Sequence, residues 1–179
     1  KGLWGSRFVL TSDQNTKGRF DNSKGGTRLS TSVGSALTGE GGAVLIIDDP
    51  SNAMEVESDL MRQGVLDWYD NALSTRLNDP RTGAIILVMQ RLHQSDLTGH
   101  LLEKGGDWEH LMLPMRYESS RHCVTGIGWS DPRSEDGELL MPERFGEDEV
   151  EELERALGPY GCNPYEAPIL MADLSMKPI

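Results

Sequence analysis

The spacing of apolar and polar residues changes along the chain, and each change predicts a new element. Val44 to Ile47 is a continuous apolar run rich in β-branched residues, which is typical of a strand covered on both faces. From Val56 to Leu77 the apolar residues fall close to helical spacing. Ala84 to Met89 predicts a second buried strand, and a further helix follows it. This alternation predicts a parallel sheet with helical crossovers.

Shorter elements are expected on both sides of this unit. Four short strands are predicted, at residues 7–11, 27–33, 109–113 and 138–141. A loop or hairpin over residues 12–26 joins the first two, and an exposed polar excursion over residues 116–137 separates the last two.

Two further helices are predicted from their end signals. Ser95 is expected to cap a helix over Asp96–Glu103, which Gly105 and Gly106 end. A helix over Glu147–Leu157 is expected to stop at Gly158 and Pro159.

Composition places the chain among globular proteins. It has 179 residues, 37% of them hydrophobic and 26% charged, which is enough for one domain with a core. No apolar run approaches the length of a membrane span, and the pattern of a signal peptide is missing. The chain starts at Lys1 rather than Met, so we expect it to begin inside a larger protein. Cys123 and Cys162 lie far apart, which indicates a reducing compartment and no structural zinc.

Charge is unevenly distributed along the chain. The net charge of −12, from 29 acidic and 17 basic residues, argues against a freestanding nucleic-acid binder. The first thirty residues are nevertheless basic on balance, whereas residues 147–154 form a dense acidic block. Two interpretations of the basic start stay open: a solvated surface, which we favour, and a local contact with nucleic acid.

Polar residues follow both buried strands at their carboxyl ends, where functional groups of parallel sheets gather. Asp48 and Asp49 follow the first strand. An apolar strand that ends in an acidic pair matches the Walker B arrangement, in which one acid holds Mg²⁺ on a nucleotide and the next orients or activates water. Pro50 directly after the acids equally indicates a turn that ends the strand. A Mg²⁺ site and a simple turn both stay open at this point.

Gln90 and Arg91 follow the second strand. A polar residue there can sense a γ-phosphate, and an arginine can neutralise phosphate charge. The alternative is that Arg91 forms a structural ion pair with Asp48, with Asp49 or with the acidic helix. His93 and His100 are interpreted as structural residues rather than metal ligands, with His100 facing solvent.

Four blocks of the sequence resemble the large terminase subunit of tailed bacteriophages and prophages. They are TSVGSALTGEGGAVLIIDDP (Thr31–Pro50), DWYDNALSTRL (Asp67–Leu77), AIILVMQRLHQSDLTGHLLE (Ala84–Glu103) and LMPERF (Leu140–Phe145). The blocks come in the family's order and spacing, and the likeness extends from Arg7 to about Gly161. The family is a viral genome-packaging motor, in which an ATPase domain drives DNA into an empty capsid and a ribonuclease-H-like nuclease cuts it.

The resemblance implies a fold and a division of the chain. The implied fold class is α/β, a three-layer parallel sheet like that of P-loop nucleotidases, incomplete because the Walker A half is missing. Residues 1–161 would be the distal half of a terminase ATPase domain, and residues 162–179 a divergent or truncated tail.

The resemblance also implies roles for the residues after the strands. Asp48 would be the Walker B acid that binds ATP-bound Mg²⁺. Asp49 would be the catalytic carboxylate, although many relatives have the longer Glu there. Gln90 and Arg91 would form the coupling motif, in which many relatives have Thr or Ser in place of Gln90. ATP and Mg²⁺ would be the cofactors of the full-length parent.

The partners implied for the parent are double-stranded DNA, the portal protein and the small terminase subunit. The parent would work as an oligomeric ring in the host cytoplasm and transiently on the procapsid, without a membrane. The chain contains no G-x-x-x-x-G-K-[S/T] motif and no recognisable nuclease domain, so we expect poor or no ATP hydrolysis by it alone. We also expect a sheet with an open edge and a bare apolar face, which would dimerise or aggregate.

Two other functions stay open. The chain could be a non-catalytic prophage remnant that serves as an interaction module, with its acidic helix exposed. It could also be part of another P-loop translocase, such as half of a helicase.

Overall fold

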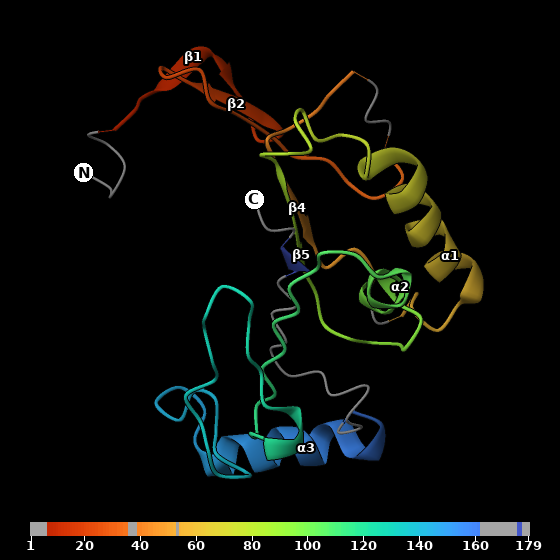
Figure 1. Cartoon of the computed structure of the whole chain (residues 1–179), viewed down its shortest axis with the longest axis vertical. Helices are drawn as coiled ribbons and strands as arrows, with labels where there is room; N and C mark the ends of the chain where they lie inside the picture. Colours follow the sequence, from red (N-terminus) through yellow and green to blue (C-terminus); the bar gives the residue numbers. More distant parts are fainter. Residues whose placement is uncertain (1–6, 36–38, 53, 162–174, 177–179) are drawn as a thin grey trace. The chain divides into compact units, whose positions relative to one another are not determined.

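The computed structural model describes residues 7–35, 39–52, 54–161 and 175–176. The chain divides into two compact units, Lys1–Thr38 and Gly39–Ile179, and each unit contains a sheet of its own (Figure 1). We call them the first unit and the second unit. The structure as a whole is of the mixed α/β class.

The first unit is a three-stranded antiparallel sheet in the order β1 (Leu10–Asn15), β2 (Arg19–Asn22) and β3 (Thr27–Leu29). The hairpin expected over residues 12–26 is therefore confirmed. Its second turn is closed by the side-chain oxygen of Asn22, which accepts hydrogen bonds from the amides of Lys24 (2.9 Å) and Gly26 (3.1 Å). The expected strand bounds are wrong at both ends, because polar residues after Thr11 extend β1 and a turn follows soon after β3.

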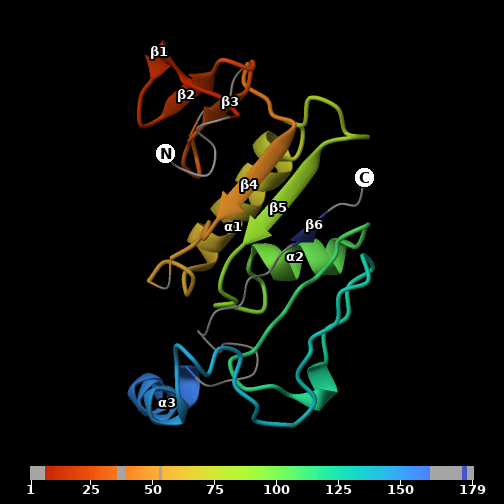
Figure 2. The ribbon, with the colours of Figure 1, turned by 90° about the vertical axis from the view of Figure 1, so that its left-hand side faces the viewer.

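The second unit contains a parallel pair of strands, β4 (Val44–Asp48) and β5 (Ala84–Val88), in register from Val44↔Ala84 to Asp48↔Val88. β6 (Ser175–Met176) pairs antiparallel with β5, and Figure 2 shows the three strands side by side. Both strands are found where the sequence predicts them, and their parallel pairing is confirmed.

Two helices cover one face of this sheet. α1 (Asp59–Trp68) continues into the π-helical turn η1 (Tyr69–Leu73), where the amide of Ser74 donates to the carbonyl of Tyr69 at 2.9 Å. α2 (Leu97–Lys104) follows β5. Figure 1 shows the sheet edge-on with both helices on the same side. The predicted helix over residues 56–77 is thus confirmed with shorter bounds.

Side-chain burial follows the position of these helices. Ile47, Ile85 and Leu87 point to the covered face and are buried. Val44 and Ile46 point to the other face and are 53% and 67% exposed. The prediction that the first strand is covered on both faces is wrong, because among the described residues helices lie on one face only. The expected bare apolar face is confirmed.

The segment between α2 and α3 (Glu147–Gly161) has little regular structure apart from the 3₁₀ turn η2 (Ser119–Arg121). The strands expected at residues 109–113 and 138–141 are wrong, since only isolated bridges such as Arg116↔Leu139 form. The buried guanidinium of Arg133 donates to the carbonyl oxygens of Pro114 (2.8 Å) and Glu138 (3.2 Å), and the Glu138 oxygen also accepts from the amide of Tyr117 (2.8 Å). Most of the stretch over residues 116–137 is exposed as expected, but buried residues such as Tyr117, Asp131 and Arg133 anchor it. α3 also continues beyond its predicted end at Pro159.

Candidate functional site

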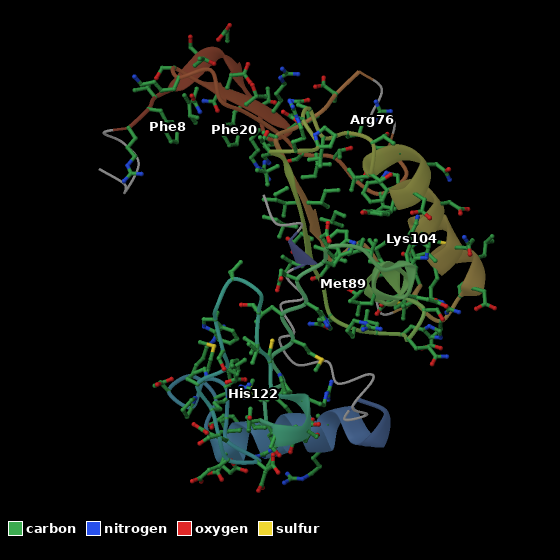
Figure 3. All side chains as sticks on the ribbon, viewed as in Figure 1. Phe8, Phe20, Arg76, Met89, Lys104 and His122 are labelled. Atoms are coloured by element: carbon green, nitrogen blue, oxygen red, sulfur yellow. The ribbon has the colours of Figure 1, made fainter. Side chains whose placement is uncertain are left out.

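The carboxyl edge of the β4–β5 pair brings three of the predicted site residues together. Asp48 ends β4 directly opposite Val88, the end of β5. The amide of Asp49 donates to the carbonyl of Val88 at 2.9 Å, and the amide of Gln90 donates to Asp49 Oδ1 at 3.3 Å. Both acids therefore lie beside Gln90 at one end of the sheet, and Met89 next to Gln90 is buried (Figure 3).

Asp49 has an unusual backbone conformation. Its φ of 42° is the one positive value among the non-glycine residues that the structure describes. The left-handed region is strained for most side chains, but Asp and Asn adopt it more readily because their short polar groups can bond locally. The strand ends at Asp48, before Pro50, and the turn and the Mg²⁺ site both stay predictions. The Asp49 carboxylate accepts from the amide of Gln90, and backbone strain of this kind often lies at functional sites.

The Asp48 carboxylate is exposed and makes no hydrogen bond or ion pair with the described residues. No group of three or more Cys, His, Asp or Glu among the described residues could hold a metal ion alone. Mg²⁺ on a nucleotide needs only one or two carboxylates, because waters and phosphate oxygens supply its other ligands. Asp48, with or without Asp49, fits that second kind of site.

Arg91 points away from the two acids. Its Nε donates to Asp96 Oδ2 at 2.9 Å, and its Nη2 donates to the carbonyl of Gln94 at 3.3 Å. The Asp96 side chain is 0% exposed and that of Arg91 is 18% exposed. The structural ion pair considered for Arg91 therefore exists, but its partner is Asp96 rather than Asp48, Asp49 or the acidic helix.

Asp96 is the residue that sequence reasoning missed. Its Oδ1 accepts from the amide of Gly99 at 2.9 Å, so Asp96 caps α2 and the predicted cap Ser95 is wrong by one residue. A Cβ atom at Gly99 would lie 1.9 Å from the carbonyl oxygen of Gln94. The loop from Arg91 to Asp96 therefore packs directly on the first turn of α2. We call the buried pair of Arg91 and Asp96 the Arg91–Asp96 clamp.

The two histidines near the edge are engaged in the fold. Nδ1 of His93 accepts from the amide of Ser95 at 3.0 Å. Nε2 of His100 lies 3.0 Å from Asp70 Oδ2, and Lys104 Nζ lies 2.8 Å from Asp70 Oδ1. His100 is half-buried against η1 and does not face solvent as expected.

Asp70 joins η1 to α2 through these two bonds. The hydrogen bond from Lys104 lowers the pKa of Asp70 and that with His100 lowers it further, against an opposing effect of burial. The neighbouring Tyr69 is buried, and this burial, with a smaller effect of Asp70, raises its pKa to about 12. Asp70 is therefore ionised and Tyr69 neutral near neutral pH.

One cavity of the second unit is separate from the carboxyl edge. It has a volume of about 400 Å³, and its walls include Tyr69, Leu101, Lys104 and Trp108 (Lys104 is labelled in Figure 3). None of Asp48, Asp49, Gln90 and Arg91 lines it. Asp48 and Asp49 are both exposed.

Comparisons of the chain with protein-family models, with curated proteins and with solved structures find no match. Of the helices that the structure describes, none has the length and apolar character that crossing a membrane requires.

Proposed function

We propose that the chain is the distal part of an ATPase domain of the terminase large-subunit type, and that Asp48 and Asp49 are half of its Mg²⁺–ATP site. The observation that carries the proposal is the meeting of both acids with Gln90 at the carboxyl edge of a parallel pair. A three-layer sheet of the P-loop nucleotidase type, without its Walker A half, belongs to the same proposal. The parallel register and the helical layer on one face support it.

In this proposal each residue at the carboxyl edge has a separate role. Asp48 is free to bind the Mg²⁺ of a nucleotide, and Mg²⁺ bound there would neutralise phosphate charge. Asp49 accepts the Gln90 amide through one oxygen and keeps the other to orient a water molecule. The exposed Gln90 side chain would contact the γ-phosphate. Arg91 would couple Gln90 to α2 through the Arg91–Asp96 clamp, because its guanidinium is already engaged.

From the same proposal we expect the isolated chain to hydrolyse ATP slowly. It contains no phosphate-cradling G-x-x-x-x-G-K-[S/T] loop, whose backbone amides and lysine supply most of the affinity for the phosphates. ATP should therefore bind in the millimolar range and be hydrolysed little. Translocation of double-stranded DNA, with a portal protein and a small terminase subunit as partners, would be the work of an assembled ring that contains the whole ATP site.

The site can be tested by NMR with Mn²⁺ in place of Mg²⁺. With millimolar ATP and a trace of Mn²⁺, amide resonances of residues 46–49 and 88–91 should broaden, and Asp48→Asn should abolish this broadening. Asp67→Asn is the matched control, because it removes an exposed carboxylate of α1. Broadening that survives Asp48→Asn, or micromolar ATP affinity in the isolated chain, would contradict the half-site.

A further inference from the structure

The boundary between the two units is also a boundary of charge. The first unit has six Lys or Arg and two Asp, a net charge of +4. The second unit has the other 11 basic and 27 acidic residues, a net charge of −16. The basic start of the sequence is thus a separate folded unit of opposite charge, which is a frequent sign of contact with a polyanion.

Three cations of the first unit are available to a partner. Lys17 lies in the turn between β1 and β2, Lys24 in the turn between β2 and β3, and Arg28 on β3. All three are exposed, and none forms an ion pair with the described residues. By contrast, Arg19 on β2 lies 3.8 Å from the Asp21 carboxylate.

The strand register separates these two kinds of cation. Phe20 pairs with Arg28, so both side chains lie on one face, and the Arg28 guanidinium lies 5.7 Å from the centre of the Phe20 ring. Asp21 pairs with Thr27, so the Arg19–Asp21 pair lies on the opposite face. The Arg28 guanidinium therefore lies on the face opposite to the Asp21 carboxylate.

The contact between Arg28 and Phe20 also limits the kind of nucleic acid that this surface can bind. A sheet that binds single strands uses open aromatic faces on which bases stack. Here the Phe20 ring (labelled in Figure 3) is occupied by a guanidinium, which it holds in place by a cation–π contact. Such an arrangement suits contact with phosphates rather than stacking on bases.

We propose that Lys17, Lys24 and Arg28 of the first unit bind the phosphate backbone of double-stranded DNA without reading its sequence. The four residues of β2 place the two lysine turns roughly 15 Å apart. A duplex carries about nine negative charges over that length. This surface is distinct from the carboxyl edge of β4 and β5, and its binding needs neither ATP nor Mg²⁺.

The test is fluorescence anisotropy of a labelled 20-base-pair duplex with the whole chain, at several NaCl concentrations and without nucleotide. The triple variant Lys17→Gln/Lys24→Gln/Arg28→Gln should lower the slope of log affinity against log salt by about 2.7, because each phosphate contact contributes about 0.9. The matched control Arg81→Gln/Arg144→Gln/Arg155→Gln removes three exposed charges from the second unit and should change the slope little. Circular dichroism checks that both variants are folded.

Four results would overturn the proposal. They are no binding by the wild-type chain at 50 mM NaCl, retained binding by the triple variant, equal loss in the control, and binding of single-stranded DNA or polyglutamate as tight as that of the duplex. The first two would leave the basic face as a solvated surface. None of these results depends on Asp48, so failure here is distinguishable from failure of the ATP site.

Discussion

At the scale of single residues, Asp96 holds the carboxyl edge together. Its carboxylate accepts from Arg91, from the amide of Gly99 and, at 3.4 Å, from the amide of His93. Because the carboxylate is fully buried, the energy lost on leaving water must be offset by these three bonds.

Replacing Asp96 by Ala should therefore lower the free energy of unfolding by about 3–5 kcal/mol, since it leaves the Arg91 guanidinium without its partner. Asp96→Asn should lower it less, because the amide oxygen can still cap α2. Urea denaturation measures both. The control is Asp59→Ala, whose ion pair with Arg62 involves a 97% exposed carboxylate and should contribute less than about 1 kcal/mol. Equal effects of Asp96→Ala and Asp59→Ala would show that burial of the pair does not matter.

Residue types predicted the edge but not all of its contacts. Asp48, Asp49 and Gln90 could be placed there, because an apolar run fixes where a parallel strand ends. The partner of Arg91 could not be predicted from the sequence, because it depends on the path of the loop after β5. Ser95 and Asp96 are both good capping residues, and only burial decides between them.

At the scale of elements, two helical glycines have opposite surroundings. A Cβ atom at Gly64 in α1 would meet no atom within 4 Å. A Cβ atom at Gly99 in α2 would overlap the carbonyl of Gln94. The same substitution should therefore have opposite effects in the two helices.

Gly64→Ala should raise the free energy of unfolding by about 0.5–1 kcal/mol, because alanine loses less backbone entropy in a helix. Gly99→Ala should lower it by about 1–3 kcal/mol, because the loop must move away from α2. Thermal unfolding of the two variants and of the wild-type chain measures both changes in stability. A stabilising Gly99→Ala would mean that the loop does not pack on α2 as described.

The bonds from Asp70 to Lys104 and His100 should make the free energy of unfolding depend on pH. The pKa of Asp70 is lower in the folded chain than in the unfolded chain, because Lys104 and His100 bind the carboxylate. The stabilisation is therefore complete above the unfolded pKa of about 4 and is lost as pH falls through the folded value.

Asp70→Asn should accordingly destabilise the chain at pH 5, and the difference from wild type should shrink as pH falls below about 4. Urea midpoints measured between pH 5 and pH 2 give this difference. Glu103→Gln, which removes an exposed carboxylate of α2, is the control at each pH. A difference that stays constant down to pH 2 would exclude ionised Asp70 as its source.

Periodicity predicted the elements around the parallel pair and failed between α2 and α3. Long apolar repeats fix α1, β4 and β5 because burial of one face dominates their energy. Between α2 and α3 the buried Arg133 side chain pairs with Asp131 at 2.8 Å and donates to the carbonyl of Pro114, which is distant in the sequence. Such a contact leaves no period in the sequence.

At the scale of the whole molecule, the second unit leaves part of its sheet without a cover. Val44 and Ile46 form an exposed apolar face, and β4 is an edge strand of the described sheet. Exposed edges and apolar faces of this kind pair with other chains.

We expect the chain to associate at micromolar concentrations and Val44→Thr/Ile46→Thr to shift it toward the monomer, because the change removes apolar surface without weakening β propensity. Sedimentation velocity measures the distribution. Leu60→Thr, at an exposed apolar residue of α1, is the control and should leave association unchanged. A wild-type chain that is monomeric at all concentrations would contradict this expectation.

The π-helical turn η1 has a consequence for how the chain is aligned with any other. A π turn is an α-helical turn widened by one inserted residue, as the bond from the amide of Ser74 to the carbonyl of Tyr69 shows. Such a helix can lose one residue between Trp68 and Ser74 and still join α1 to β5. A homologue with a one-residue gap at this position would therefore keep the parallel sheet while changing which side chain lies opposite Lys104. In an alignment with such a homologue, the position of the gap at η1, rather than the similarity of the residues, would decide which residue is matched to Asp70.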